Sequence, residues 1–134
     1  MTDIPTTTAA PDGVISDPAD RKALLAQLSD LLGPRGFTAN HEAMAPWLTD
    51  WRGRYTGRAL ALLSPDDATQ LAQIVRRAGA AGVPIVPQGG NSGMGGGATP
   101  DAGGHSLLVS LRRMNTIGTI DKDAMQVTCG AGVI

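Results

Sequence analysis

Leucine spacing near the start of the chain predicts an amphipathic helix. Five leucines recur at the i, i+1, i+4, i+7 and i+8 spacing that gives a helix one apolar face: Leu24, Leu25, Leu28, Leu31 and Leu32. Asp17 can cap this helix, Pro18 suits its first position, and Asp20 lies where a capping-box acid belongs. Gly33 and Pro34 are expected to end it. We expect an ordinary packing helix between these limits.

A strand, a helix and a second strand are predicted in the middle of the chain. Residues 59–63 are a short apolar run typical of a buried strand. The helix is predicted to begin with Ser64 as its cap and Asp67 as the reciprocal acid, and to end at Gly79. Its buried face is expected to comprise Leu71, Ile74, Val75 and Ala78. Residues 83–86 form the second strand, so the unit predicts two parallel strands joined by a right-handed crossover.

Further strands are predicted in the second half of the chain. Apolar runs at residues 106–111 and 125–129 indicate two strands, and residues 116–120 can form a short one between them. Cys129 is expected to be a small buried residue of the last strand. With the strand–helix–strand unit, these elements predict an α+β fold.

An irregular segment, residues 37–57, lies between the first helix and this unit. Aromatic and basic residues gather along it: Trp47, Trp51, Tyr55, Arg52, Arg54 and, just beyond, Arg58. Two interpretations are open, an anion-binding surface or a solvated loop anchored by its two tryptophans. Charged loop residues are mostly exposed, which favours the second interpretation.

Composition and charge narrow the class of protein. A chain of 134 residues suffices for one small domain, and its net charge of −1 argues against a nucleic-acid partner or a polybasic membrane surface. No apolar run approaches the roughly 20 residues that span a bilayer. Residues 1–15 lack the pattern of a secretory signal and predict a disordered tail. Since the single Cys129 can form no internal disulfide, a reducing compartment and a cytoplasmic location are expected.

The candidate chemistry lies directly after the second strand of the unit. Six of the nine residues 89–97 are glycine, and Asn91 and Ser92 are two of the other three. Glycine lets a ligand approach the main chain, and successive backbone N–H groups form a concave anion site. The segment also leaves the carboxyl end of a parallel strand, where open α/β sheets bind ligands. It therefore predicts a phosphate-binding loop.

Two common kinds of phosphate loop do not fit. The Walker type needs a lysine beside its last glycine, and no lysine lies between residues 22 and 122. A dinucleotide fingerprint can be placed on Gly93, Gly95 and Ala98, but such a fingerprint must open a helix. Residues 99–104 contain a proline and two glycines and predict no helix.

What remains is a loop that binds a diphosphate through backbone amides. Asn91 and Ser92 can assist it, since both side chains are short, uncharged and able to hydrogen-bond a phosphate oxygen. A diphosphate held without metal or lysine suits a tightly bound cofactor better than a phosphoryl group in transfer, whose developing charge needs cations.

This loop is similar to one from a known family. The run Pro87-Gln88-Gly89-Gly90-Asn91-Ser92-Gly93-Met94, followed by Gly96-Gly97, resembles the pyrophosphate-binding loop of flavoproteins of the vanillyl-alcohol-oxidase/PCMH type. Within that family it is most similar to the D-2-hydroxyacid dehydrogenases, which include D-lactate, glycolate and D-2-hydroxyglutarate dehydrogenases. The resemblance extends to residues 50–58, 107–115 and 130–133, and so covers the chain from about residue 49 onward.

The resemblance implies FAD as the cofactor and a set of residues that hold it. The amides of residues 89–93 would wrap the FAD diphosphate, Gly96 and Gly97 would let the chain pass close by, and residues 130–133 would begin the approach to the flavin. Relatives with covalent flavin often carry histidine where this chain has Asn91, so non-covalent FAD is expected. The implied cofactor-binding residues are Pro87, Gln88, Gly89, Gly90, Asn91, Ser92, Gly93, Met94, Gly96, Gly97, Gly130, Gly132 and Val133.

The resemblance also implies a domain organisation. The fold would be α+β and of the PCMH FAD-binding type, with a first subdomain that holds the βαβ unit and then the start of a mainly antiparallel sheet. The chain ends in an apolar run, so we expect it to be the front part of a larger protein. Its parts would be a tail at 1–15, a helix and irregular lead-in at 16–48, and the N-terminal part of the FAD-binding domain at 49–134.

The activity implied for the whole protein is oxidation of a D-2-hydroxy acid by hydride transfer to flavin N5. Electrons would pass on to an unknown acceptor, and a homodimer is left open. No catalytic residue or metal ligand is assigned in these 134 residues, and His41 and His105 are expected to be surface residues. Two alternatives remain: a binding module for another diphosphate ligand without a redox role, and a fragment that is inactive on its own.

Overall fold

The computed structural model describes residues 17–134, so the tail expected at residues 1–15 lies outside the described residues. In chain order the helices and strands are α1 (Pro18–Gly36), β1 (Phe37–Thr38), α2 (His41–Met44), the 3-10 helix η1 (Ala45–Trp47), β2 (Ala61–Leu63), α3 (Ala68–Ala80), β3 (Ile85–Gln88) and β4 (Leu107–Ser110). The strands form one sheet in the order β1-β2-β4-β3. Within the described residues, no helix is both long and apolar enough to cross a lipid bilayer.

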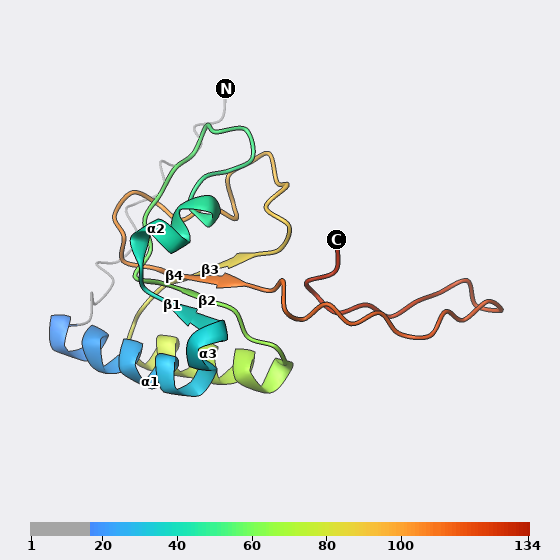
Figure 1. Cartoon of the computed structure of the whole chain (residues 1–134), viewed down its shortest axis with the longest axis horizontal. Helices are drawn as coiled ribbons and strands as arrows, with labels where there is room; N and C mark the ends of the chain where they lie inside the picture. Colours follow the sequence, from blue (N-terminus) through green and yellow to red (C-terminus); the bar gives the residue numbers. More distant parts are fainter. Residues whose placement is uncertain (1–16) are drawn as a thin grey trace, which may run out of the picture.

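Helices cover both faces of the sheet (Figure 1). On one face, Leu63 and Val109 pack into a cluster with Ile74 of α3 and the buried leucines of α1. On the other face, Leu62 and Leu108 pack against the α2–η1 segment. Because successive strand residues point to opposite faces, both faces of β2 and β4 are apolar and every residue in the two strands is buried.

The central strands are parallel, and β4 lies between the two strands of the βαβ unit. Leu63 of β2 pairs with Val109, and Gln88 of β3 pairs with Ser110, both in parallel register. The predicted parallel arrangement of β2 and β3 is therefore confirmed, with a third strand inserted between them. The carboxyl ends of β2, β3 and β4 consequently meet at one edge of the sheet.

Helix α1 begins where the sequence predicts and turns sharply at Gly33. The Asp17 side chain accepts a hydrogen bond of 2.9 Å from the Ala19 N–H and caps the helix. Gly33 has φ of +64°, a left-handed conformation that favours glycine, and one more helical turn follows this kink before β1.

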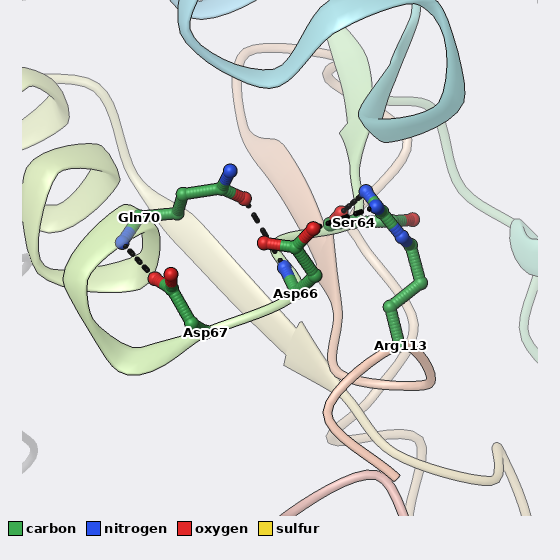
Figure 2. A network of polar contacts seen from close by, with 5 residues as sticks. All are labelled: Ser64, Asp66, Asp67, Gln70 and Arg113. Carbon is green, nitrogen blue, oxygen red and sulfur yellow. Dashed lines mark hydrogen bonds and ion pairs between the residues drawn. The ribbon is translucent and has the colours of Figure 1, made fainter.

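Helix α3 begins later than the sequence predicts. Asp67 is its cap and accepts a 2.7 Å hydrogen bond from the Gln70 N–H, while the Gln70 side chain accepts one from the Asp66 N–H (Figure 2). Ser64 was expected to be the cap, but it is buried and its N–H donates to the Gly36 carbonyl. The helix also extends past Gly79 to Ala80.

The predicted buried face of α3 is partly wrong. Ile74 and Ala78 are buried and Leu71 is partly buried against the same cluster, but Val75 is 52% exposed. The shared face follows the i, i+3, i+7 positions, and Val75 lies about 100° further around the helix than Ile74.

Arg113 ties the end of β2 to the chain that leaves β4. Its guanidinium donates a 2.8 Å hydrogen bond to the Ser64 carbonyl and forms a 2.9 Å ion pair with Asp66 (Figure 2). Ser64 is buried, so its carbonyl needs this donor. The Ser64 carbonyl is therefore occupied by Arg113 and does not accept the first hydrogen bond of a helix capped at Ser64, which agrees with the later start of α3 at Ala68.

Beyond β4 the chain forms a narrow arm that leaves the sheet and returns (Figure 1). Strands were predicted at 116–120 and 125–129, but the described structure has only isolated antiparallel bridges there, Ile117 with Cys129 and Asp121 with Gln126. Cys129 is exposed, so its predicted burial is wrong. Two strands without a third or a covering helix are marginal, which explains the irregular pairing.

We predict that the cap at Asp67 is a measurable part of the stability of this unit. Replacing Asp67 by alanine leaves the Gln70 N–H without its acceptor and should lower the free energy of unfolding by about 1 kcal/mol. Asp67→Asn keeps an acceptor oxygen and should cost less than about 0.5 kcal/mol. Urea unfolding measures both, and equal losses would contradict the assignment.

Candidate functional site

An open cleft of about 590 Å³ lies at the edge of the sheet where β3 and β4 end. Three parts of the chain line it: the segment around Trp47 and Asp50, the start of the glycine loop at residues 88–91, and Ser110 with Arg112 after β4. Ile134 from the returning arm closes one side. The cleft is therefore built where parallel strands end, the usual ligand position in such sheets.

The chain's own fold explains only some of the loop's glycines. Gly96 has φ of +77°, and a Cβ there would come within 2.8 Å of the Tyr55 ring. A Cβ on Gly90 would meet only the Ile134 side chain, at 3.2 Å. Gly89, Gly93, Gly95 and Gly97 have no left-handed φ, and a Cβ on any of them would meet no atom within 4 Å.

The amides of this loop are available to a ligand. Within the described chain, no backbone N–H of residues 89–98 donates a hydrogen bond, and the next one, of Thr99, donates to Gly96. Most of these residues are exposed. A run of free N–H groups on glycines that have space above them fits a diphosphate, because the group can approach the backbone closely.

Two side-chain amides hold the loop in place. The Gln88 Nε2 donates to the carbonyls of Trp47 and Ala98, at 3.0 and 2.9 Å, and thereby joins the two ends of the loop to the facing segment. Asn91 has φ of +54°, and its Nδ2 donates 2.9 Å to the Thr49 carbonyl. The N–H side of the Asn91 amide is thus engaged by the protein.

The other predicted loop residues lie outside the cleft. Ser92, Gly93, Met94 and Gly97 are exposed further along the loop, and Pro87 is exposed within β3. The structure therefore brings Gln88, Gly89, Gly90 and Asn91 together around the cleft and leaves the remainder at its outer side.

The predicted glycines near the end of the chain have a reason within the fold. A Cβ on Gly130 would overlap the Met114 carbonyl oxygen, and one on Gly132 would overlap that of Leu111. These glycines let the returning arm cross the chain that leaves β4. The crossing carries half-buried Val133 and then Ile134 back to Gly90.

Asp50 organises the wall opposite the loop. It is only 4% exposed, and its carboxylate accepts 2.7 Å hydrogen bonds from the N–H groups of Arg54 and Tyr55 and a longer one from Arg52. The N–H of Tyr55, followed by those of Arg54 and Arg52, holds the pKa of the Asp50 carboxyl below its ordinary value of 3.8, although burial opposes the shift.

Of the segment expected to be irregular, residues 37–48 hold β1, α2 and η1, and only residues 51–56 are an exposed loop, which its tryptophans do not anchor as expected. Trp51 is 60% exposed, and only Trp47 is half-buried. The buried carboxylate of Asp50 fixes residues 50–55 instead. A bridge between Thr49 and Thr56 closes the base of this loop.

Two buried polar atoms beside the cleft have no partner in the described chain. They are Oε1 of Gln88 and Oγ of Ser110, on residues that are each 1% exposed and pair across β3 and β4. Buried polar atoms in native proteins are nearly always hydrogen-bonded. Both residues line the cleft, so an unpartnered acceptor and an unpartnered hydroxyl lie buried beside it.

Sequence reasoning missed Trp47, Ser110 and Arg112 as cleft residues. A partial signal for the last two was present, because Ser110 lies near the end of the strand predicted at residues 106–111 and Arg112 follows it, but the parallel pairing of that strand with β3 was not predicted. Parallel strands end at one edge, so residues just after them lie beside the loop that follows β3. The position of Trp47 depends on long-range packing, which the local pattern does not contain.

A second open cleft of about 830 Å³ lies between α1 and α3. It shares no lining residue with the glycine loop and includes Asp17, Asp20 and Arg77. None of the unpartnered buried atoms of the described chain lines it. The smaller cleft is therefore the candidate site.

Comparison with known proteins gives consistent matches. The family model of the FAD binding domain matches residues 59–134. A probable D-2-hydroxyglutarate dehydrogenase of Oryza sativa subsp. indica is 31% identical over 78% of this chain and 18% of its own length. The glycolate oxidase subunit GlcD of Bacillus subtilis is 29% identical over 81% of this chain and 23% of its own length. The chain thus spans about a fifth of the length of these curated relatives.

Solved structures agree on the fold. The chain superposes on p-cresol methylhydroxylase with a TM-score of 0.73 and 17% identity, over 88% of this chain and 23% of that one. At this identity the likeness concerns the fold alone, and it confirms the α+β, PCMH-type fold expected from the resemblance.

The names of the curated relatives contradict the expected cytoplasmic location. The rice relative and those from Arabidopsis thaliana, Schizosaccharomyces pombe and Bos taurus are named as mitochondrial proteins. A single cysteine and the absence of a secretory pattern do not separate one reducing compartment from another.

We predict a pH dependence from Asp50. Its pKa is lower in the folded than in the unfolded protein, so its stabilising contribution is complete above about pH 4 and is lost as the pH falls through the folded pKa. Asp50→Asn should lower the free energy of unfolding at about pH 7, and this deficit should shrink near pH 3. Urea unfolding of both proteins at the two pH values measures it, and a deficit independent of pH would contradict the prediction.

Proposed function

The chain belongs to the FAD binding domain family, and on that premise we propose that it forms the diphosphate-binding part of the flavin site in an oxidoreductase of D-2-hydroxy acids. The family inferred from the glycine loop is thereby confirmed, and FAD is its cofactor. Which residues hold the FAD and which substrate is oxidised belong to the proposal.

One observation carries the assignment of the loop. Four of its glycines, at 89, 93, 95 and 97, are required neither by a left-handed backbone nor by a neighbouring atom of the described chain. Ordering so many glycines is entropically costly, so a plain connection would not retain them. Close approach of a ligand to the unpaired amides supplies the missing reason.

We propose that the whole loop contributes to the cofactor site, with non-covalent FAD. The residues so assigned are Pro87, Gln88, Gly89, Gly90, Asn91, Ser92, Gly93, Met94, Gly96, Gly97, Gly130, Gly132 and Val133. In this arrangement the amides from Gly89 onward bind the diphosphate, and Gln88 and Asn91 hold the loop to the facing segment. Gly130 and Gly132 act indirectly, by allowing the crossing that brings Val133 toward the loop.

The proposed substrate is a small D-2-hydroxy acid of the 2-hydroxyglutarate, lactate or glycolate type. Its support is that similar proteins are named as D-2-hydroxyglutarate dehydrogenases, a putative D-lactate dehydrogenase and a glycolate oxidase subunit. Bound flavin would supply the hydride acceptor at N5. The residues described here bind and orient that cofactor; His41 and His105 are exposed and do not line the cleft.

Other parts of the proposal concern the protein as a whole. We place the boundary of the FAD-binding part near residue 49, with residues 16–48 as a lead-in; within it, α1 and the α2–η1 segment cover the sheet. An electron acceptor takes the electrons onward, and a homodimer is compatible with this organisation. A mitochondrial setting has support from the names of four relatives.

Spectroscopy tests the proposed function. Purified protein that carries this chain should show flavin absorption, and denaturation should release all of the flavin into the supernatant. Adding D-2-hydroxyglutarate, D-lactate or glycolate without oxygen should bleach the flavin band with at least one of them. A colourless protein that binds ADP but cannot be reconstituted with FAD would instead indicate the non-redox diphosphate module.

A pair of glycine variants tests the loop assignment. Gly89→Ala adds a methyl group where the chain has free space, so the fold should be unaffected, but FAD affinity should fall about 10- to 100-fold because Gly89 lines the cleft and the methyl occupies the ligand's space. Gly79→Ala is the matched control, since its Cβ also meets nothing and it lies in α3. Fluorescence titration with FAD measures both, and equal affinity in the two variants would contradict the assignment.

A further inference from the structure

Arg112 has an unusual position beside the glycine loop. It is exposed, it is the second residue after β4, and its guanidinium lies over the Trp47 ring, 4.4 Å from the ring centroid. It lines the same cleft as Gly89 and Gly90. Within the described chain, Arg112 has no carboxylate partner, so the ring alone orients its charge.

The neighbouring arginine has a different role. Arg113 donates to Ser64 and pairs with Asp66 at the end of β2, and so serves the fold (Figure 2). Arg112 makes no such contact to a structural carbonyl or acid. The two adjacent arginines therefore have different roles. The charge of Arg113 is neutralised by Asp66, whereas Arg112 lines the cleft.

The charges around the cleft leave a place for an anion. Arg112 is the one cationic side chain among the described lining residues, and Asp50 is the one anionic side chain. The Asp50 carboxylate is occupied by three backbone N–H groups of its own loop. The free amides of residues 89–98 and the Arg112 guanidinium, by contrast, have no anionic partner in the described chain.

A second observation points to a ligand at this place. Ser110, two residues before Arg112, is 1% exposed and lines the cleft, and its hydroxyl has no hydrogen-bond partner. A buried hydroxyl that can donate, beside an oriented guanidinium and unpaired amides, matches the acceptor oxygens of a phosphate.

We propose that Arg112, held over Trp47, is a side-chain ligand of the diphosphate and gives the loop the positive charge that its backbone amides lack. The inference rests on the proposed function for the identity of that diphosphate as FAD. It revises the expectation from the sequence that amides, Asn91 and Ser92 alone bind the group. Stacking on Trp47 lowers the entropy that the long arginine side chain would lose on binding.

Binding measurements with three ligands test this. In the protein that carries this chain, Arg112→Gln should raise the dissociation constants of FAD and ADP about 10- to 100-fold, the loss expected for one charge-assisted contact. Riboflavin, which has no phosphate, should bind equally to both proteins. Arg112→Lys keeps the charge but loses the planar fork, so its affinity should be intermediate. Arg76→Gln, on the exposed face of α3, loses the same charge and should change nothing.

The outcomes separate the inference from the function on which it rests. If FAD binds and Arg112→Gln lies within about twofold of the wild type, the inference is overturned and the proposed function stands. If FAD does not bind but ADP does, and Arg112→Gln weakens it, the diphosphate contact is supported and the flavin function is overturned. If neither ligand binds the wild type, both are overturned.

Discussion

Parallel pairing of β2 and β3 with β4 is the constraint on which the candidate site depends. The register of Leu63 with Val109 and of Gln88 with Ser110 brings three strand ends to one edge of the sheet. The chain must leave the sheet three times at this edge, and each exit has a different role. The exit from β2 leads to α3, the exit from β3 is the glycine loop, and the exit from β4 carries the two arginines.

Structural and binding roles divide cleanly among these exits. Arg113 and Asp66 form an ion pair between the segments that follow β4 and β2. Gln88 and Asn91 hold the glycine loop through their side-chain amides. Asp50 holds the loop on the opposite wall of the cleft through hydrogen bonds to its backbone. Each of these polar groups is used by the protein itself. Beside the cleft, the groups that can donate to an anion and have no partner in the described chain are the loop amides, the Ser110 hydroxyl and the Arg112 guanidinium. These groups suit an anionic ligand that carries acceptor oxygens.

The parts of the fold that the sequence predicts are those with strong local signals. The leucine pattern of α1 and the apolar runs of β2, β3 and β4 gave elements of the right type in the right place. The start of α3 was misplaced because Asp67, expected to be the reciprocal acid, is the cap, whereas Ser64 is buried and its carbonyl accepts a hydrogen bond from the distant Arg113. The strands expected in the arm failed because pairing needs a neighbour that local sequence does not provide.

In the candidate site, too, local sequence identified some features and long-range contacts determined the others. Glycine content identified the loop, since ordering so many glycines is entropically costly and close approach of a ligand offsets that cost. It could not tell which glycines serve the backbone and which leave room: Gly96 is left-handed beneath Tyr55, whereas Gly93 faces open space. Arg112 was not predicted as a site residue, because only the pairing of β3 with β4 places it beside the loop.

Amide hydrogen exchange in the glycine loop, with and without FAD, tests the central claim most directly. The N–H groups of residues 89–97 donate to nothing in the described chain, so they should exchange rapidly in the free protein. Saturating FAD should protect them, and should leave the amides around Gly33 and Gly53 unchanged. Protection that appears at the α1–α3 cleft while residues 89–97 continue to exchange freely would show that this loop does not hold the diphosphate.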